Sequence, residues 1–138
     1  MPVLDAAPVL RGRRVLVVED DFFLALELEE QLEAAGAIVV GPVPSIKDAA
    51  LLLTIARRID VALLDVNLGG ELVYPLADQL TAMGVPLVFV TVLARHEMPV
   101  RFGGMPRCDK PVEMSRVVLA ARAACGLGRS DASIPSWL

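Results

Sequence analysis

The stretch ALLDVNLGG, residues 62–70, places Asp65 directly after a run of aliphatic residues and shortly before two glycines. A continuous apolar run is typical of a strand in a parallel sheet, because helices cover such a sheet on both faces. The run around Asp65 is one of several in the chain. Together they predict parallel strands at residues 14–18, 37–41, 60–64, 86–90 and, more weakly, 105–109.

Apolar residues between these runs recur every three or four positions, which is typical of amphipathic helices. The spacing predicts helices over residues 24–35, 46–56, 73–83 and 114–121. Residues 95–102 contain Pro99 and are followed by two glycines, so we expect the fourth helix in chain order to be short or mobile. Strands that alternate with helices predict a doubly wound α/β fold with a five-stranded parallel sheet.

The chain has 138 residues, which is the size of one ordinary domain. We expect an N-terminal tail over residues 1–12, a globular domain over 13–127, and a flexible C-terminal tail over 128–138. Trp137 in the second tail is either loosely ordered or an anchor on a neighbouring surface. Cys108 and Cys125 are expected to be small buried residues rather than a disulfide.

The composition argues against several classes of protein. The longest apolar run, residues 85–94, is interrupted by Pro86 and Thr91 and is too short to cross a bilayer. The net charge is −4 and the basic residues are scattered, so nucleic-acid binding is not expected. The first residues lack the order of a secretory signal, with their arginines after the apolar residues, which favours a cytoplasmic protein.

Polar residues follow four of the predicted strands, at the edge of the sheet where open α/β folds bind ligands. They are Glu19 and Asp20 after the first strand, Asp65 after the third, Thr91 after the fourth and Lys110 after the fifth. Two carboxylates about 4 Å apart repel by roughly 4 kcal/mol at an effective dielectric constant near 20, so an acidic cluster indicates a bound cation. Oxygen ligands favour Mg²⁺, with Mn²⁺ next.

This combination of groups is suited to phosphoryl transfer. Asp65 is the candidate nucleophile, Thr91 a hydrogen-bond donor, and Lys110 with the cation would neutralise the phosphoryl oxygens. The glycines after Asp65 would leave the mouth of the site open to a phosphodonor. Asp21 is a third possible ligand, but capping of the following helix is the favoured interpretation.

The pattern resembles the receiver domains of two-component response regulators over about residues 13–127. Those domains carry an acidic pair after strand one, an aspartate after strand three, Thr or Ser after strand four, and Lys-Pro after strand five. The resemblance implies a flavodoxin-like sheet with strand order 2-1-3-4-5 and phosphorylation of Asp65. It also implies metal binding by Asp20 directly, Glu19 through water, Asp65 and the Asn67 backbone carbonyl, and a cis bond before Pro111.

A closer resemblance is to the FATGUY subgroup of receivers, which often stand alone, through DVNLGGELVYPLAD (65–78) and PLVFVT (86–91). The chain departs from the pattern at two positions. Val92 replaces the subgroup's glycine, and Arg107 stands where receivers usually have a switch Tyr or Phe. Asn67 and Leu93 occupy positions that tune dephosphorylation in the family, and the apolar Leu93 predicts a long-lived phosphoryl group.

The resemblance implies a stand-alone switch, phosphorylated by a sensor histidine kinase or phosphotransfer protein, that acts on no other substrate and is therefore not an enzyme. A downstream partner would bind the face formed by the fourth helix, fifth strand and fifth helix, and a homodimer is possible. Alternatives are a phosphate sink and a pseudo-receiver that binds its partner without phosphorylation, which Val92 and Arg107 favour. A haloacid dehalogenase-type phosphatase is excluded because Asn67 replaces its general acid. His96 is expected to be a surface residue.

Overall fold

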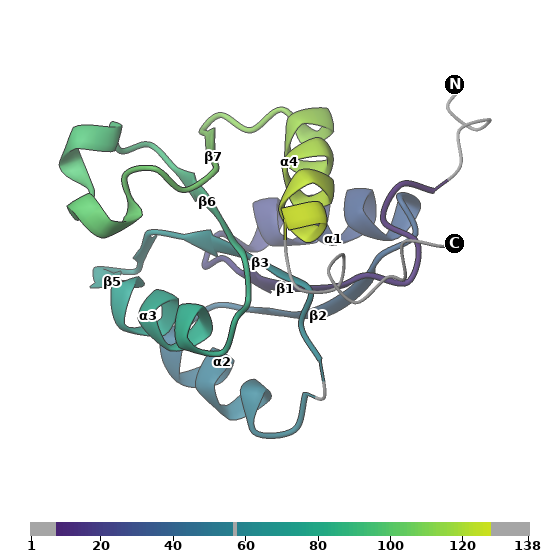
Figure 1. Cartoon of the computed structure of the whole chain (residues 1–138), viewed down its shortest axis with the longest axis horizontal. Helices are drawn as coiled ribbons and strands as arrows, with labels where there is room; N and C mark the ends of the chain where they lie inside the picture. Colours follow the sequence, from purple (N-terminus) through teal and green to yellow (C-terminus); the bar gives the residue numbers. More distant parts are fainter. Residues whose placement is uncertain (1–7, 57, 128–138) are drawn as a thin grey trace.

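A computed structural model of the chain describes residues 8–56 and 58–127. Its centre is a five-stranded parallel sheet in the order β2-β1-β3-β6-β7 (Figure 1). The strands are β1 (Arg14–Val18), β2 (Ile38–Val43), β3 (Val61–Asp65), β6 (Leu87–Thr91) and β7 (Arg107–Asp109). Numbered without the small hairpin between β3 and β6, this is the predicted order 2-1-3-4-5, so the doubly wound, flavodoxin-like fold is confirmed.

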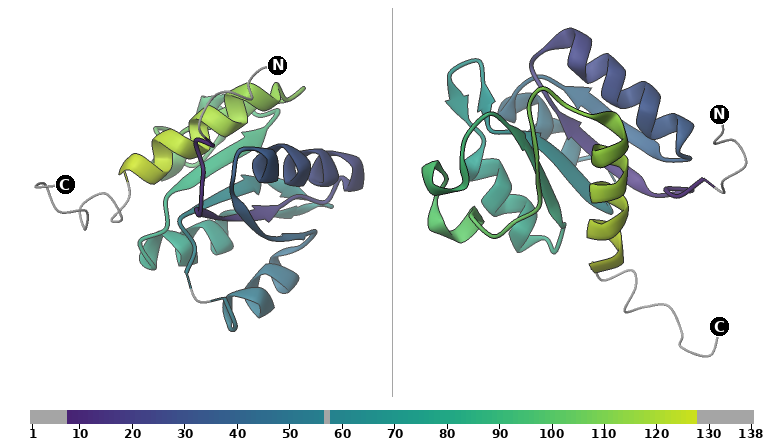
Figure 2. Two further views of the ribbon diagram at one scale, coloured as in Figure 1. Left: turned by 90° about the vertical axis from the view of Figure 1, so that its right-hand side faces the viewer. Right: turned by 90° about the horizontal axis from the view of Figure 1, so that it is seen from above.

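Helices cover both faces of the sheet, as Figures 1 and 2 show. Side chains of α1 and α4 pack on one face, and side chains of α2 and α3 pack on the other. Successive residues of a strand point to opposite faces. Val15 and Val17 therefore join the core that α1 and α4 cover, while Leu16 and Val18 join the core that α2 and α3 cover. Burial on both faces is the reason that these strands read as continuous apolar runs. The helices are α1 (Phe22–Ala34), α2 (Ile46–Leu53), α3 (Tyr74–Ala82) and α4 (Met114–Leu127).

A small hairpin follows β3 that the sequence analysis did not predict. Strands β4 (Asn67–Leu68) and β5 (Glu71–Leu72) pair antiparallel. The turn between them consists of Gly69 and Gly70, whose φ angles are +65° and +97°. Two-residue hairpin turns require positive φ, and a Gly-Gly pair is a known signal for them. The two glycines therefore form the turn of a hairpin beside the strand ends.

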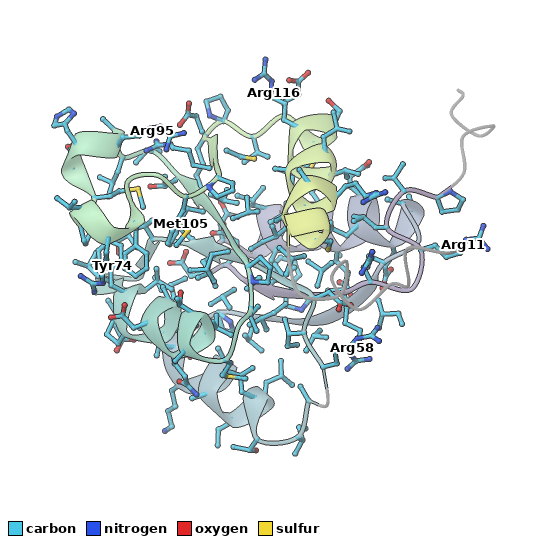
Figure 3. All side chains as sticks on the ribbon, viewed as in Figure 1. Arg11, Arg58, Tyr74, Arg95, Met105 and Arg116 are labelled. Atoms are coloured by element: carbon cyan, nitrogen blue, oxygen red, sulfur yellow. The ribbon has the colours of Figure 1, made fainter. Side chains whose placement is uncertain are left out.

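The segment between β6 and β7, where the sequence predicts a short or mobile fourth helix, contains no α-helix. Two short 3-10 helices replace it, η2 (Arg95–Glu97) and η3 (Val100–Phe102). Pro99 lies between them as the N-cap of η3, and a proline cannot donate the amide hydrogen bond that a continuous helix would need. The Arg95 guanidinium donates to the carbonyls of Gly103 (2.7 Å) and Met105 (3.2 Å), so it fastens the two ends of the segment together (Figure 3).

Residues 8–12, assigned above to the N-terminal tail, pack against the domain. Leu10 is fully buried in the core that α1 and α4 cover. Its amide donates to the Ala35 carbonyl at 2.8 Å, and the Gly12 amide donates to the Gly36 carbonyl at 3.0 Å. The rest of that predicted tail, residues 1–7, and the predicted C-terminal tail with Trp137 lie outside the described residues. None of the helices within residues 8–56 and 58–127 is long and apolar enough to span a bilayer.

Helix α1 begins beside the predicted site and depends on a side-chain cap. The Asp21 carboxylate accepts hydrogen bonds from the amides of Phe23 (3.0 Å) and Leu24 (3.1 Å), which confirms the capping interpretation. We expect Asp21→Ala to lower the free energy of unfolding by about 1 kcal/mol, because two amides lose their acceptor. Urea denaturation measures the loss, and Asp21→Asn, which keeps an acceptor oxygen, should restore most of it. An alanine variant as stable as the wild type would contradict the role of the cap.

Candidate functional site

The carboxyl ends of the central strands open into a cavity of about 520 Å³. It lies beside the β4–β5 hairpin, and it gathers most of the residues that the sequence singled out. Its lining includes Asp20, Asp21, Asp65, Asn67, Thr91, Val92, Leu93 and Lys110. These residues are far apart in the sequence, from Asp20 to Lys110. They meet in one cavity because the parallel strands that carry them end at the same edge of the sheet.

Three carboxylates meet beside this cavity, and two of them, Asp20 and Asp65, line it. Glu19, Asp20 and Asp65 each offer one oxygen atom, and these atoms all lie within 4.8 Å of one another. Glu19 and Asp65 are buried while Asp20 is exposed. Glu19 Oε1 is buried and accepts no hydrogen bond, its nearest cation being the Lys110 ammonium at 3.4 Å, although a buried polar atom is costly unless it is satisfied. A set of oxygen ligands with one unsatisfied member fits a hard divalent cation such as Mg²⁺ or Mn²⁺.

The Lys110 ammonium lies between two of these carboxylates. Its Nζ is 3.1 Å from Asp65 Oδ2 and 3.4 Å from Glu19 Oε1. Burial acts to lower the pKa of Lys110, but the charges of Glu19 and Asp65 outweigh this effect and raise it above the ordinary lysine value. Burial, reinforced by the neighbouring Asp65 carboxylate, raises the pKa of Glu19 to about 8. The acidic pair thus needs nearby positive charge, and Lys110 supplies one unit of it.

The ends of β3 and β6 place a carboxylate and a hydroxyl in the cavity, each held by a backbone amide. Asp65 is the last residue of β3, and its Oδ1 accepts from the Asn67 amide at 3.3 Å. Thr91 is the last residue of β6, and its Oγ1 accepts from the Leu93 amide at 3.0 Å. A hydroxyl that accepts one hydrogen bond can still donate its own hydrogen. Asp65 can therefore attack a group in the cavity while Thr91 donates to it.

Known proteins with a similar sequence or structure show which family this fold and site belong to. No model of a protein family matches the sequence. SdrG from Sphingomonas melonis Fr1 is 36% identical in sequence, with a TM-score of 0.69, over 81% of this chain and 97% of SdrG. A response regulator receiver protein from Burkholderia phymatum has the same fold, with a TM-score of 0.73 at 22% identity over 83% of this chain and 96% of that protein. The chain belongs to the response regulator receiver domains.

A curated relative is longer than the segment that matches this chain. The uncharacterized transcriptional regulatory protein YbdJ of Bacillus subtilis (strain 168) is 27% identical over 96 residues, which is 70% of this chain. The chain spans 41% of the length of YbdJ. Membership of the FATGUY subgroup within the receivers stays a prediction.

In this receiver domain, the position of the usual aromatic switch residue carries a buried arginine with several partners. The side chain of Arg107 is 9% exposed and pairs with the Asp109 carboxylate at 2.7 Å. It also donates to the Leu93 carbonyl and contacts the Met98 sulfur at 3.7 Å. The sequence shows the substitution, but these contacts depend on how the β6–β7 segment folds back over β7. Nothing in the sequence pattern could have indicated them.

The remaining predicted features lie around the receiver's cavity. The Lys110–Pro111 peptide bond is cis. Val92 is 74% exposed at the rim, beside the buried Thr91. His96 is exposed in η2, as predicted for a surface residue. Cys108 is buried in the core that α1 and α4 cover, again as predicted.

Proposed function

We propose that this receiver domain is a phosphoacceptor switch that takes a phosphoryl group from the phosphohistidine of a sensor kinase or phosphotransfer protein onto Asp65. The observation that carries the proposal is the placement of Asp65, whose carboxylate faces the cavity between two other acids and Lys110. The function is that of a cytoplasmic phosphorelay component. Its chemistry is directed at its own side chain, so we do not assign it an enzymatic activity on other molecules.

Phosphorylation is an in-line displacement at phosphorus. An oxygen of the Asp65 carboxylate attacks the phosphorus atom of the phosphohistidine and forms a new P–O bond. The P–N bond breaks at the same time, and its electron pair leaves with the imidazole nitrogen. Lys110, already 3.1 Å from Asp65 Oδ2, can follow the developing negative charge on the phosphoryl oxygens, and Thr91 can donate a hydrogen bond to one of them.

The acidic groups support binding of Mg²⁺, with Mn²⁺ as a substitute. Glu19, Asp20, Asp65 and the backbone carbonyl of Asn67 would hold the ion, Glu19 through a water molecule. When bound, the ion neutralises charge on the phosphoryl group. The unsatisfied Glu19 Oε1 and the oxygen-only donor set support this assignment.

The output surface would be the predicted face, with η2 and η3 in the place of the fourth helix, β7 as the fifth strand and α4 as the last helix. This face exposes apolar side chains that a partner could cover. Val100 on η3 is 96% exposed, and Leu119 on α4 is 63% exposed. Phosphorylation changes partner affinity only if the partner binds the two states of this face differently.

The test is phosphorylation by a small-molecule donor. The wild-type protein is incubated with acetyl phosphate and either Mg²⁺ or a chelator, and its intact mass is measured. We expect one phosphoryl group with Mg²⁺ and none with the chelator. Labelling that is equal in both samples would contradict the metal site, and no labelling in either would contradict the phosphoacceptor function.

A second measurement separates the switch from its two alternatives. Beryllofluoride serves as a stable mimic of the phosphoryl group. Proteins that bind the beryllofluoride-treated chain are compared with those that bind the untreated chain. The switch predicts a partner that prefers the treated form. Equal binding to both forms would favour the pseudo-receiver, the alternative that Arg107 and Val92 support. Labelling without a partner that prefers the treated form would favour a phosphate sink.

A further inference from the structure

The backbone of Leu93 is held on both sides by groups of the receiver site. Its amide donates to Thr91 Oγ1 at 3.0 Å, and its carbonyl accepts from the Arg107 guanidinium. The Leu93 side chain is partly buried against the apolar core and lines the same cavity as Asp65. Leu93 therefore forms an apolar part of the cavity wall, and the hydrogen bond from Arg107 helps to hold its backbone in place.

Arg107 is itself oriented by a carboxylate on its own strand. Its Nε lies 3.1 Å and its Nη2 2.7 Å from Asp109 Oδ1. Asp109 pairs with Thr91 in the sheet register, so this carboxylate stands beside the strand end that carries the hydroxyl. A guanidinium has several donors in a rigid plane, which lets one side chain bind a carboxylate and a carbonyl at once. A Phe at this position could do neither.

We propose that Arg107 is a positioning residue that sets the lifetime of the aspartyl phosphate, by holding Leu93 against the cavity. The inference rests on the proposed phosphorylation of Asp65. Hydrolysis requires a water molecule whose oxygen attacks phosphorus while the P–O bond to Asp65 breaks. The bonding electrons return to the carboxylate, and the water's protons pass to phosphate and solvent. An apolar side chain held at the cavity wall limits the approach of that water, and loss of its anchor admits it.

The first test is the decay of the phosphorylated protein. The wild type, Arg107→Ala and Arg101→Ala are labelled with acetyl phosphate and Mg²⁺, freed of donor, and followed by intact mass. We expect Arg107→Ala to lose its phosphoryl group about fivefold faster than the wild type, which is the kinetic equivalent of losing one modest contact. Arg101→Ala is the matched control, because Arg101 ties the same β6–β7 segment to Asp78 at 2.9 Å without touching Leu93. Its decay should equal that of the wild type.

The second test asks whether Arg107 acts through Leu93. Leu93→Ala should also speed the decay, and adding Arg107→Ala to it should cause no further change, because the side chain that Arg107 positions is already gone. Effects that multiply in the double variant would overturn the inference, since they would mean that Arg107 acts independently. A general loss of stability would give such independent effects.

Asp109→Ala tests the same network from an exposed site. The Asp109 side chain is 77% exposed, so its removal leaves the core intact even if Arg107→Ala does not fold. Decay faster than in the wild type supports the orienting role of Asp109, and unchanged decay in this variant overturns the inference. A wild type that takes no label contradicts the proposed function itself. A wild type that is labelled but decays as fast as Arg107→Ala contradicts only the role of Arg107.

Discussion

Asp65→Asn is expected to abolish phosphoryl incorporation. The carboxylate of Asp65 lies at the end of β3 in the cavity, 3.1 Å from the Lys110 ammonium, and it is the group placed to attack phosphorus. An amide has nearly the same shape but lacks the negative charge that makes a carboxylate nucleophilic. The fold is therefore retained while the acceptor is lost. Intact mass after incubation with acetyl phosphate and Mg²⁺ measures the change.

The matched control for this loss is Asp78→Asn. Asp78 is an exposed acid on α3 and is not among the acids that could hold the cation. The control should accept a phosphoryl group as the wild type does. Equal labelling of Asp65→Asn and the wild type would show that another residue is the acceptor, and peptide mapping would then identify it.

Lys110→Ala is expected to slow phosphorylation by about a hundredfold, the typical cost of removing one group that stabilises developing negative charge. The ammonium lies within 3.4 Å of oxygens of both Glu19 and Asp65. Without it, two buried carboxylates and the incoming phosphoryl oxygens lose a unit of neutralising charge. The initial rate of labelling by acetyl phosphate, at a fixed Mg²⁺ concentration, measures the effect.

Lys47 provides the comparison for Lys110. It is an exposed lysine on α2, and its replacement by alanine removes the same charge from the chain without touching the cavity. Lys47→Ala should be phosphorylated at the wild-type rate. If Lys110→Ala were also phosphorylated at that rate, the lysine would serve only to pair the acids in the unphosphorylated protein.

Much of the architecture could be predicted because it follows from local patterns. The continuous apolar runs at β1, β3 and β6 reflect burial on both faces of the sheet, because the helices that connect parallel strands cover both faces. The polar residues that end these strands could be picked out for the same reason. Asp65 and Thr91 each stand at the last position of a fully buried strand, where side chains first reach the open edge.

Two local features were harder to predict because their signals are weak. A Gly-Gly pair such as Gly69–Gly70 signals a hairpin turn between extended segments, but the strands β4 and β5 that flank it have only two residues each. Residues 95–102 have too few apolar residues to select a helix by themselves. Their two 3-10 turns are held by Arg95 and by the ion pair between Arg101 and Asp78, whose partners are distant in sequence or outside the segment.

The sequence by itself determined the parallel α/β fold and the kinds of residue at the strand ends, because periodicity and strand termination are properties of neighbouring residues. Only the tertiary structure decided that Leu10 belongs to the core and that Arg107 fastens Leu93 beside Asp65. These contacts join segments far apart in the chain, and a long side chain such as arginine can reach several partners. Which partner it reaches is fixed only when the surrounding backbone is in place.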